Sequence, residues 1–305
     1  MSVFTAVEEP ELRTLLAELD LTLLDFRPAS QGIENSNYLV DACHADGQRD
    51  DLVLTLFEHL SADTLPWYAQ VLTRLAAQGL PVPCPRAHPR GTVFFLSGKP
   101  AMLVPRLPGV HILRPDAQHC RQIGQALARL HQVAINHSPL ADERSQLPHR
   151  LTLLPDGPER DSAGKLLARW LNSGGDRVLV HADLFRDNAL FVGDQLSGLL
   201  DFYNACHDHP SYDLAVAIND WCVDDNGAPL PEQQAALLEG YLSERSLSSE
   251  DLDLLPTALA VAALRFWLSR LAGRHKTALE GSGSKDPEPF ARLYRRRLSA
   301  IESGD

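Results

Sequence analysis

Cysteine is scarce in this 305-residue chain, and the cysteines that occur show no pairing pattern. There are five of them, an odd number, and no C-x-x-C motif occurs. This distribution argues against a disulfide framework and against a structural zinc site. The densest run of possible metal ligands is Cys206-His207-Asp208-His209, and no further Cys or His lies close by in the sequence to complete a tetrahedral site. We therefore predict a polar loop at residues 206–209 rather than a transition-metal centre.

Basic residues are in the minority, and long apolar runs are missing. The chain has 28 Lys and Arg against 40 Asp and Glu, a formal net charge of -12, which disfavours a nucleic-acid groove. No apolar run reaches the roughly 18 residues that a membrane span requires. The acidic segment 1–9 lacks the positive and apolar regions of a secretion leader. We therefore expect no nucleic-acid partner, no membrane insertion and a cytoplasmic location.

The first hundred residues alternate short β-branched runs with turn residues, which predicts an antiparallel sheet of five strands. Asp46-Gly47 between two of these runs is typical of a hairpin. One stretch of helical periodicity ends at Gly79, with prolines just beyond it, and predicts a long helix. The strands are expected at residues 22–27, 38–42, 52–57, 92–96 and 101–104, and the helix at 64–78.

Helical periodicity prevails in the rest of the chain. Prolines and a glycine interrupt every pattern at 105–109, so we predict two domains, residues 1–104 and residues 105–305, with an α+β fold. Asp116 has the side chain of a helix N-cap, and the basic run 295–297 is expected to be a solvated helix face. The helices of the second domain are expected at residues 116–133, 162–172, 211–222, 231–242, 254–271 and 290–301.

The most informative run is His181-Ala182-Asp183-Leu184-Phe185-Arg186-Asp187-Asn188. The apolar segment 178–180 before it predicts a buried strand. Segments 190–192 and 196–200 after it predict a hairpin, and Asp201 follows the second of these strands. A hairpin between them can bring the carboxylates of Asp183 and Asp201 back toward each other. Protein kinases show this order of a catalytic Asp, an Asn five residues later and a metal-binding Asp after two strands.

Phosphoryl transfer explains the residue types in this run. The reaction needs an aligned nucleophile and neutralisation of the phosphate charge by Mg²⁺. Asp183 is predicted to orient, or to accept the proton from, the attacking hydroxyl. Asn188 and Asp201 offer the hard oxygen ligands that Mg²⁺ prefers. His181 is also assigned to the catalytic site, as a residue that hydrogen-bonds the loop.

Several further stretches accompany this run. Together with this run, these stretches make the chain resemble the kinases related to aminoglycoside phosphotransferases and choline kinases. Those kinases share a bilobal protein-kinase-like fold. Within the group, the chain most resembles the homoserine kinase branch. The resemblance covers most of the chain. The matching stretches are residues 32–38, 52–58, 124–131, 180–188, 198–203, 212–215 and 219–222.

The resemblance implies ATP and Mg²⁺ as cofactors and L-homoserine as the small-molecule substrate. It assigns nucleotide binding to the smaller domain, with loop amides over the phosphates and the adenine against the end of the fifth strand. Substrate contacts are expected from Asp183, Tyr203 and Trp221, and Asp213 is expected to anchor the catalytic loop. The residues implied for ATP are Gly32, Asn35, Ser36, Asn37, Thr55, Met102 and Val104.

The chain departs from the family pattern at Thr55, where many relatives carry a phosphate-binding cation paired with a helix Glu. Segment 64–78 contains no acidic residue, so both halves of that pair are missing. Other acceptors of the same fold, namely choline, methylthioribose and an aminoglycoside, stay open at this point. So do a non-catalytic nucleotide-binding protein and, more weakly, a metal-dependent hydrolase. The oligomeric state is not predicted.

Overall fold

A computed structural model describes residues 4–29, 35–136, 146–280 and 285–303, with the backbone alone for 275–280. The chain divides into two compact units. Unit 1 comprises Met1–Gly109 with Ser197–Leu200, and unit 2 comprises Val110–Leu196 with Asp201–Asp305. The division falls shortly after the predicted domain boundary. The nucleotide-binding and substrate-binding roles assigned to the two domains stay predictions.

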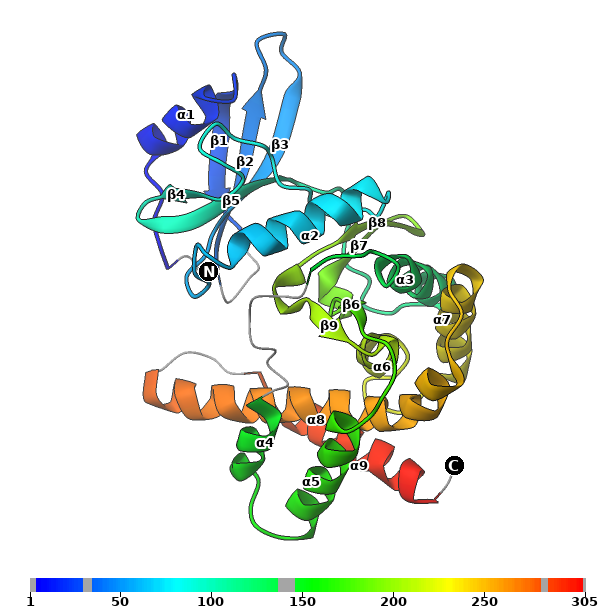
Figure 1. Ribbon diagram of the computed structural model, residues 1–305. Coiled ribbons are helices and arrows are strands. Elements are labelled where there is room, and N and C mark those ends of the chain that lie inside the picture. The colour runs from blue at the N-terminus through cyan, green and yellow to red at the C-terminus, as the bar shows by residue number, and fades with distance from the viewer. Residues whose placement is uncertain (1–3, 30–34, 137–145, 281–284, 304–305) are drawn as a thin grey trace. The chain divides into compact units, whose positions relative to one another are not determined.

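Unit 1 contains the predicted five-stranded antiparallel sheet, in the order β1-β2-β3-β5-β4 (Figure 1). The β2–β3 hairpin turns at Gly47, whose φ of 85° favours glycine, as the Asp-Gly pair predicts. The helix predicted at 64–78 is α2. The elements of unit 1 are α1 Glu9–Ala17, β1 Thr22–Pro28, β2 Ser36–Cys43, β3 Arg49–Leu56, α2 Leu65–Ala77, β4 Phe94–Leu96 and β5 Lys99–Pro105.

The two faces of this sheet differ in burial. Along β2, buried residues alternate with partly exposed ones, because side chains of a strand point to opposite faces in turn. Tyr38 and Val40 lie on the buried face, in one hydrophobic core with Leu12, Leu15 and Leu16 of α1. The opposite face of the same strands carries Asn37 and its neighbours, which are described with the site below.

Unit 2 is mainly helical and contains the short antiparallel pair β6–β9. Strand β7 pairs with β8, whose last residues belong to the Ser197–Leu200 segment of unit 1. The strand and hairpin predicted around the catalytic run are present as β6, β7 and β8. The elements after residue 110 are α3 Ala117–Leu130, α4 Leu147–Arg150, η2 Leu151–Leu153, α5 Pro158–Leu171, β6 Val178–Val180, η3 Arg186–Asn188, β7 Ala189–Val192, β8 Gln195–Leu199, η4 Phe202–Asn204, β9 Cys206–Asp208, α6 Pro210–Trp221, α7 Pro231–Glu244, α8 Ser249–Glu280 and α9 Glu288–Ser303.

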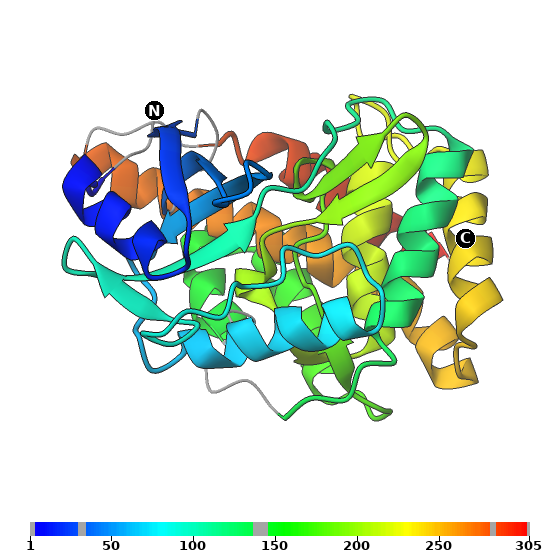
Figure 2. The same cartoon turned by 90° about the horizontal axis from the view of Figure 1, so that it is seen from above.

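Helices α3 and α7 lie side by side in both views (Figures 1 and 2). Two glycines permit this contact. A Cβ on Gly124 of α3 would lie 1.9 Å from the carbonyl oxygen of Leu237, and one on Gly240 of α7 would lie 2.0 Å from that of Arg121. Both oxygens belong to the backbone of a helix and cannot move by themselves. The close spacing of α3 and α7 therefore requires glycine at both positions. Asp116 caps α3 as predicted, by accepting a hydrogen bond from the His119 amide.

Helix α8 packs against α5, α6 and α9 and forms the centre of unit 2. Among the described residues, its segment Ser249–Arg274 is the one helical stretch long and apolar enough to cross a membrane. Most of that stretch is buried inside the protein, as expected for the core helix of a globular unit. The helix begins earlier than predicted because Ser248 and Asp251 cap it reciprocally, each accepting a hydrogen bond from the other's amide.

Two sequence predictions are wrong in unit 2. The segment predicted as a polar loop contains strand β9, which pairs with β6, and its Asp208 is buried and forms an ion pair with Arg177. No group of three or more His, Cys, Asp or Glu side chains that could hold a metal ion occurs there or elsewhere in the described ranges. In the basic run of α9, Arg297 is not solvated like its neighbours but donates from Nε to Asn219 Oδ1 at 3.1 Å. Burial lowers the pKa of Arg297.

Candidate active site

The loop that follows β6 is held by one buried carboxylate, that of Asp213 in α6. Its two oxygens accept the backbone N–H groups of His181 at 2.7 Å and Ala182 at 2.8 Å, and His131 Nε2 lies 3.1 Å away. Burial by itself would raise the pKa of Asp213, but the hydrogen bond from His131, the charges of His131 and His181, and the backbone hydrogen bond of His181 together hold it below its ordinary value. The predicted anchoring role of Asp213 is confirmed.

The anchor holds the loop in an unusual conformation. Ala182 has a φ of 64°, which costs a non-glycine residue about 1–2 kcal/mol. His181 is fully buried, and its ring centroid lies 4.4 Å from that of Phe202. Its Nδ1 accepts the Asp183 amide at 3.3 Å. His181 thus positions the loop from within the protein, as expected for a residue that hydrogen-bonds the loop.

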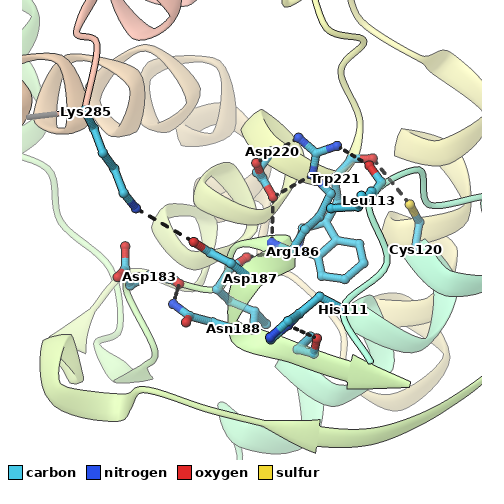
Figure 3. Close-up of polar contacts among 12 residues, drawn as sticks. His111, Leu113, Cys120, Asp183, Arg186, Asp187, Asn188, Asp220, Trp221 and Lys285 are labelled. Atoms are coloured by element: carbon cyan, nitrogen blue, oxygen red, sulfur yellow. Dashed lines mark hydrogen bonds and ion pairs between the residues drawn. The ribbon is translucent and has the colours of Figure 1, made fainter. Parts of the chain in front are cut away.

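Asp183 and Asn188 are joined through the backbone of this loop. The Asn188 side-chain nitrogen donates to the Asp183 carbonyl oxygen at 2.8 Å, a contact drawn in Figure 3. The Asp183 carbonyl also accepts the Phe185 amide at 2.8 Å, which closes the turn. The Asp183 side chain is 20% exposed, so its carboxylate reaches solvent while its backbone is constrained. A carboxylate held in this way is suited to orient a small alcohol.

Asp201 follows strand β8 at the start of the short helix η4. It is exposed and has a φ of 59°, in the left-handed region that Asp tolerates better than most residues. Three residues later, Asn204 donates from its side chain to Asp183 Oδ2 at 3.3 Å. The hairpin therefore does bring the segment of Asp201 back to Asp183. Tyr203, predicted to contact substrate, lies partly exposed in the same short helix.

Arg265, which was not among the predicted site residues, projects from α8 to the carboxylate of Asp183. Its Nη1 lies 3.5 Å from Asp183 Oδ1, and its Nη2 donates to Asn204 Oδ1 at 3.1 Å. Arg265 is 5% exposed. Asp183, Asn204 and Arg265 thus form one polar cluster. The sequence did contain a signal, because Arg265 is the single Arg inside the apolar stretch 258–268. An arginine is rarely buried unless it is paired, so this position indicated a buried partner.

Further polar contacts support the loop (Figure 3). Asp220 accepts hydrogen bonds from the backbone and the guanidinium of Arg186, and Lys285 Nζ lies 3.8 Å from Asp187 Oδ2. Trp221 is fully buried, and its indole N–H donates to the Leu184 carbonyl at 3.0 Å. This burial leaves no exposed indole surface for a substrate, so the predicted substrate contact of Trp221 is not supported by its position.

In unit 1, four of the residues predicted to bind ATP share one face of the sheet. Asn37, Thr55 and Met102 stand directly opposite one another on β2, β3 and β5, and Val104 lies two residues from Met102. Thr55 Oγ1 donates to Asn37 Oδ1 at 2.7 Å. The polar pair Thr55–Asn37 therefore stands at the position where the family pattern has a cation. Gly32 lies outside the residues that the structure describes.

Ser36 lies apart from this group, on the core face of the sheet. It is fully buried, donates to Glu58 Oε1 at 2.6 Å, and accepts the amides of Phe4 and Thr5. Asn35 Oδ1 accepts the Glu58 amide at 3.3 Å. These contacts tie the N-terminal segment to the sheet, and the side chain of Ser36 does not share the face of Asn37.

The buried carboxylate of this second cluster is ionised and paired. Burial by itself would raise the pKa of Glu58, but hydrogen bonds from Ser36, Lys99 and Thr5 outweigh it and lower the pKa. Lys99 Nζ lies 2.9 Å from Glu58 Oε2. The charges of Glu58 and Lys99 therefore neutralise each other at the edge of the core.

Comparisons to known proteins identify the family and the fold of this chain. Residues 25–247 match the model of the phosphotransferase enzyme family, and the chain belongs to that family. Homoserine kinase of Sinorhizobium fredii is 38% identical over 328 residues, which cover 100% of this chain and 98% of that protein. Homoserine kinase of Pseudomonas aeruginosa is 39% identical over 313 residues, covering 97% of each chain. The chain is thus a member of the homoserine kinase family and an ATP-dependent phosphotransferase.

Solved structures show the same fold at low identity. The amicoumacin kinase hAmiN, solved with AMP-PNP, Ca²⁺ and Ami, has a TM-score of 0.63 and 15% identity, covering 97% of this chain and 94% of that chain. The macrolide 2′-phosphotransferase MphH of Brachybacterium faecium has a TM-score of 0.61 and 20% identity, covering 96% and 97%. The predicted α+β, protein-kinase-like fold is therefore confirmed.

Proposed function

We propose that this protein transfers the γ-phosphoryl group of ATP to the side-chain hydroxyl of L-homoserine and releases O-phospho-L-homoserine, a step toward threonine. The observation that carries the acceptor is the identity of 38–39% with homoserine kinases along almost the whole chain. The observation that supports the reaction type is the constrained loop with the partly exposed Asp183 carboxylate at its centre.

Asp183 is assigned to the acceptor hydroxyl. Its carboxylate would accept a hydrogen bond from that hydroxyl and take its proton as the bond to phosphorus forms, an assistance of about 10²–10⁴-fold in rate. Arg265 and Asn204 hold the carboxylate from behind, so its rotation is restricted before the substrate arrives. Asp213 and His181 are positioning residues, because they contact the loop rather than the reacting atoms.

Asn188 and Asp201 are assigned to Mg²⁺. The Asn188 amide nitrogen is used by the Asp183 carbonyl, and its Oδ1 has no hydrogen-bond partner within the described part of the chain. Asp201 presents an exposed carboxylate. These two residues would supply hard oxygen ligands, which suit Mg²⁺ that arrives with a nucleotide. When bound, Mg²⁺ would neutralise charge on the transferring phosphoryl group.

The nucleotide is assigned to the face of the unit 1 sheet that carries Asn37, Thr55, Met102 and Val104. Met102 is fully buried and would lie behind the adenine ring rather than contact it, whereas Val104 is 9% exposed and can supply apolar surface. The Thr55–Asn37 pair supplies neutral hydrogen-bonding groups. Without a cation at Thr55, charge neutralisation would rest on Mg²⁺ and on amide groups. A strong dependence of ATP binding on the Mg²⁺ concentration is the expected consequence.

The proposal is tested by ADP release with L-homoserine, choline, methylthioribose and an aminoglycoside as alternative acceptors. L-homoserine should give the highest kcat/KM. Asp183→Ala should lower kcat about 10²–10⁴-fold, and Asp201→Ala should weaken nucleotide binding at limiting Mg²⁺. Asp194→Ala, an exposed residue of the β7–β8 turn, is the control and should retain full activity. A higher kcat/KM for another acceptor would reject homoserine, and full turnover by folded Asp183→Ala would reject the mechanism.

A further inference from the structure

Three aromatic rings form a cluster beside the catalytic loop of unit 2. Phe185 belongs to the loop, Phe266 to α8 and Phe290 to α9. The ring centroids of Phe185 and Phe266 are 4.4 Å apart, those of Phe266 and Phe290 are 5.2 Å apart, and those of Phe185 and Phe290 are 5.9 Å apart. Two guanidinium groups stack on this cluster, Arg265 at 4.1 Å over Phe266 and Arg270 at 4.4 Å over Phe290. Both cations project from α8.

The two arginines differ in their partners. Arg265 already interacts with the catalytic carboxylate. Arg270 donates from Nη1 to the backbone carbonyl of Asp286 at 2.8 Å and stacks on Phe290. Within the described part of the chain it has no carboxylate at ion-pair distance. Burying a guanidinium without an anion is costly, so a half-buried arginine that lacks one is suited to receive an anion from a ligand.

Two contacts link Arg270 to the loop that carries Asp183. Lys285, the residue before its carbonyl partner Asp286, reaches Asp187 of the catalytic loop at 3.8 Å. Burial lowers the pKa of Arg270, while the negative charges of Asp286, Asp220, Asp187 and Asp183 act in the opposite direction. The guanidinium therefore stays positive and lies within the electrostatic reach of the catalytic carboxylate.

The chemistry of the acceptor supplies the missing anion. L-homoserine carries its hydroxyl at one end of a short carbon chain and an α-carboxylate at the other. A planar guanidinium is the side chain best suited to a carboxylate, because it can donate two parallel hydrogen bonds. Stacking on Phe290 leaves the edge of that plane for such a contact.

We propose that Arg270 binds the α-carboxylate of the acceptor amino acid and thereby determines its selection over simple amino alcohols. The proposal rests on the homoserine kinase function proposed above and extends it to a specificity-determining residue. Asp183 faces the hydroxyl at one end of the acceptor, and Arg270 faces the carboxylate at the other. The aromatic cluster keeps the guanidinium in place.

The test compares two acceptors in wild type and in Arg270→Met. L-homoserine and 3-amino-1-propanol have the same hydroxyl, amine and carbon spacing, and only the former has a carboxylate. Loss of a hydrogen bond to a charged group typically lowers affinity about 10- to 100-fold. The variant should lose that factor in kcat/KM for homoserine, mainly through KM, and less than about threefold for 3-amino-1-propanol. If the amino alcohol reacts too slowly, its inhibition constant against homoserine replaces the turnover measurement.

Two further variants separate specificity from stability. Arg270→Lys keeps the charge but loses the fork, so it should fold and show an intermediate loss for homoserine alone; it decides the question if Arg270→Met does not fold. Arg295→Met is the matched control, because Arg295 also stacks on a ring, Trp267 at 5.4 Å, but is paired with Glu159. The acceptor ratio should not change in this control.

The outcomes distinguish the two proposals. Equal losses for both acceptors in folded Arg270 variants would overturn the role of Arg270 and leave it as a tether between α8 and Asp286, while the homoserine kinase function stands. Homoserine that neither binds wild type in calorimetry with an ATP analogue nor reacts would overturn both proposals. A changed acceptor ratio confined to the Arg270 variants would support the carboxylate site.

Discussion

Replacing Asp213 by Asn tests the claim that one buried carboxylate holds the catalytic loop. The aspartate accepts two backbone N–H groups and contacts His131, and it is fully buried. Asparagine has nearly the same shape, but only one of its two terminal atoms is an acceptor. One of the backbone N–H groups, that of His181 or that of Ala182, would then face another donor.

The expected cost follows from these contacts. Loss of one hydrogen bond to a charged acceptor costs about 1.5–3 kcal/mol, and the orphaned buried N–H costs about 1–3 kcal/mol more. The sum, roughly 2.5–6 kcal/mol, is a large part of the about 5–15 kcal/mol that stabilises a typical domain. In either case the loop loses one of the two backbone contacts that hold it at His181 and Ala182, so Asp183 would shift. A displacement of about 1 Å at a reacting group can cost roughly 10²-fold in kcat.

Denaturant unfolding and ADP release would measure the two effects of Asp213→Asn. Asp253→Asn, an exposed change in α8, should stay within about 0.5 kcal/mol of wild type. Because the folded-state pKa of Asp213 is lowered, its stabilising contribution is present above the unfolded value of about 3.9 and is lost as the pH falls through the lower folded value. The variant should lack this part of the acid dependence. Unchanged stability and kcat in Asp213→Asn would refute the anchoring argument.

Three further outcomes are expected. Arg265→Met should lower kcat at least about tenfold with little change in the KM for ATP, because the carboxylate that we propose orients the acceptor hydroxyl, that of Asp183, would lose a partner. A change in melting temperature alone would contradict this role. Gly124→Ala should destabilise the protein by about 3 kcal/mol or more in denaturant unfolding, since its Cβ would overlap a backbone oxygen of α7. Its control is Gly273→Ala, whose Cβ would meet nothing within 4 Å and which should be neutral or slightly stabilising. Burial raises the pKa of Tyr241 and of Tyr294 to about 12, so stability should fall as the pH rises from about 10 toward 12, and phenolate absorbance should show both ionising late; titration of every tyrosine near 10 would rule this out.

The local patterns of the sequence predicted most of the secondary structure. Alternating runs, the Asp-Gly hairpin and the helix caps depend on neighbouring residues, so they can be recognised without tertiary information. The catalytic loop belongs to the same class, because the positions of Asp183 and Asn188 and the hairpin before Asp201 are encoded over a short span. The sequence also predicted that Thr55 stands where a phosphate-binding cation was expected. In the structure, Thr55 forms a hydrogen bond with Asn37.

The direction in which a side chain points, and whether it is buried, could be read only from the tertiary structure. Ser36 and Asn37 are adjacent in a loop-like sequence, and only strand pairing shows that their side chains point to opposite faces. The run at 206–209 has the composition of a polar loop, but pairing with β6 makes it a strand. A tryptophan is a plausible residue for a substrate pocket, but the packing of α6 against distant elements buries Trp221 completely.

Local patterns along the chain were sufficient to predict the five-stranded sheet, the helical second half and the loop around Asp183. The contacts of this loop with distant residues could be recognised only after folding was known. Arg265 stands 82 residues from Asp183, and Asp213 stands 32 residues from His181. Residue spacing along a chain encodes periodicity and short turns, whereas contacts at such separations arise from the packing of whole helices.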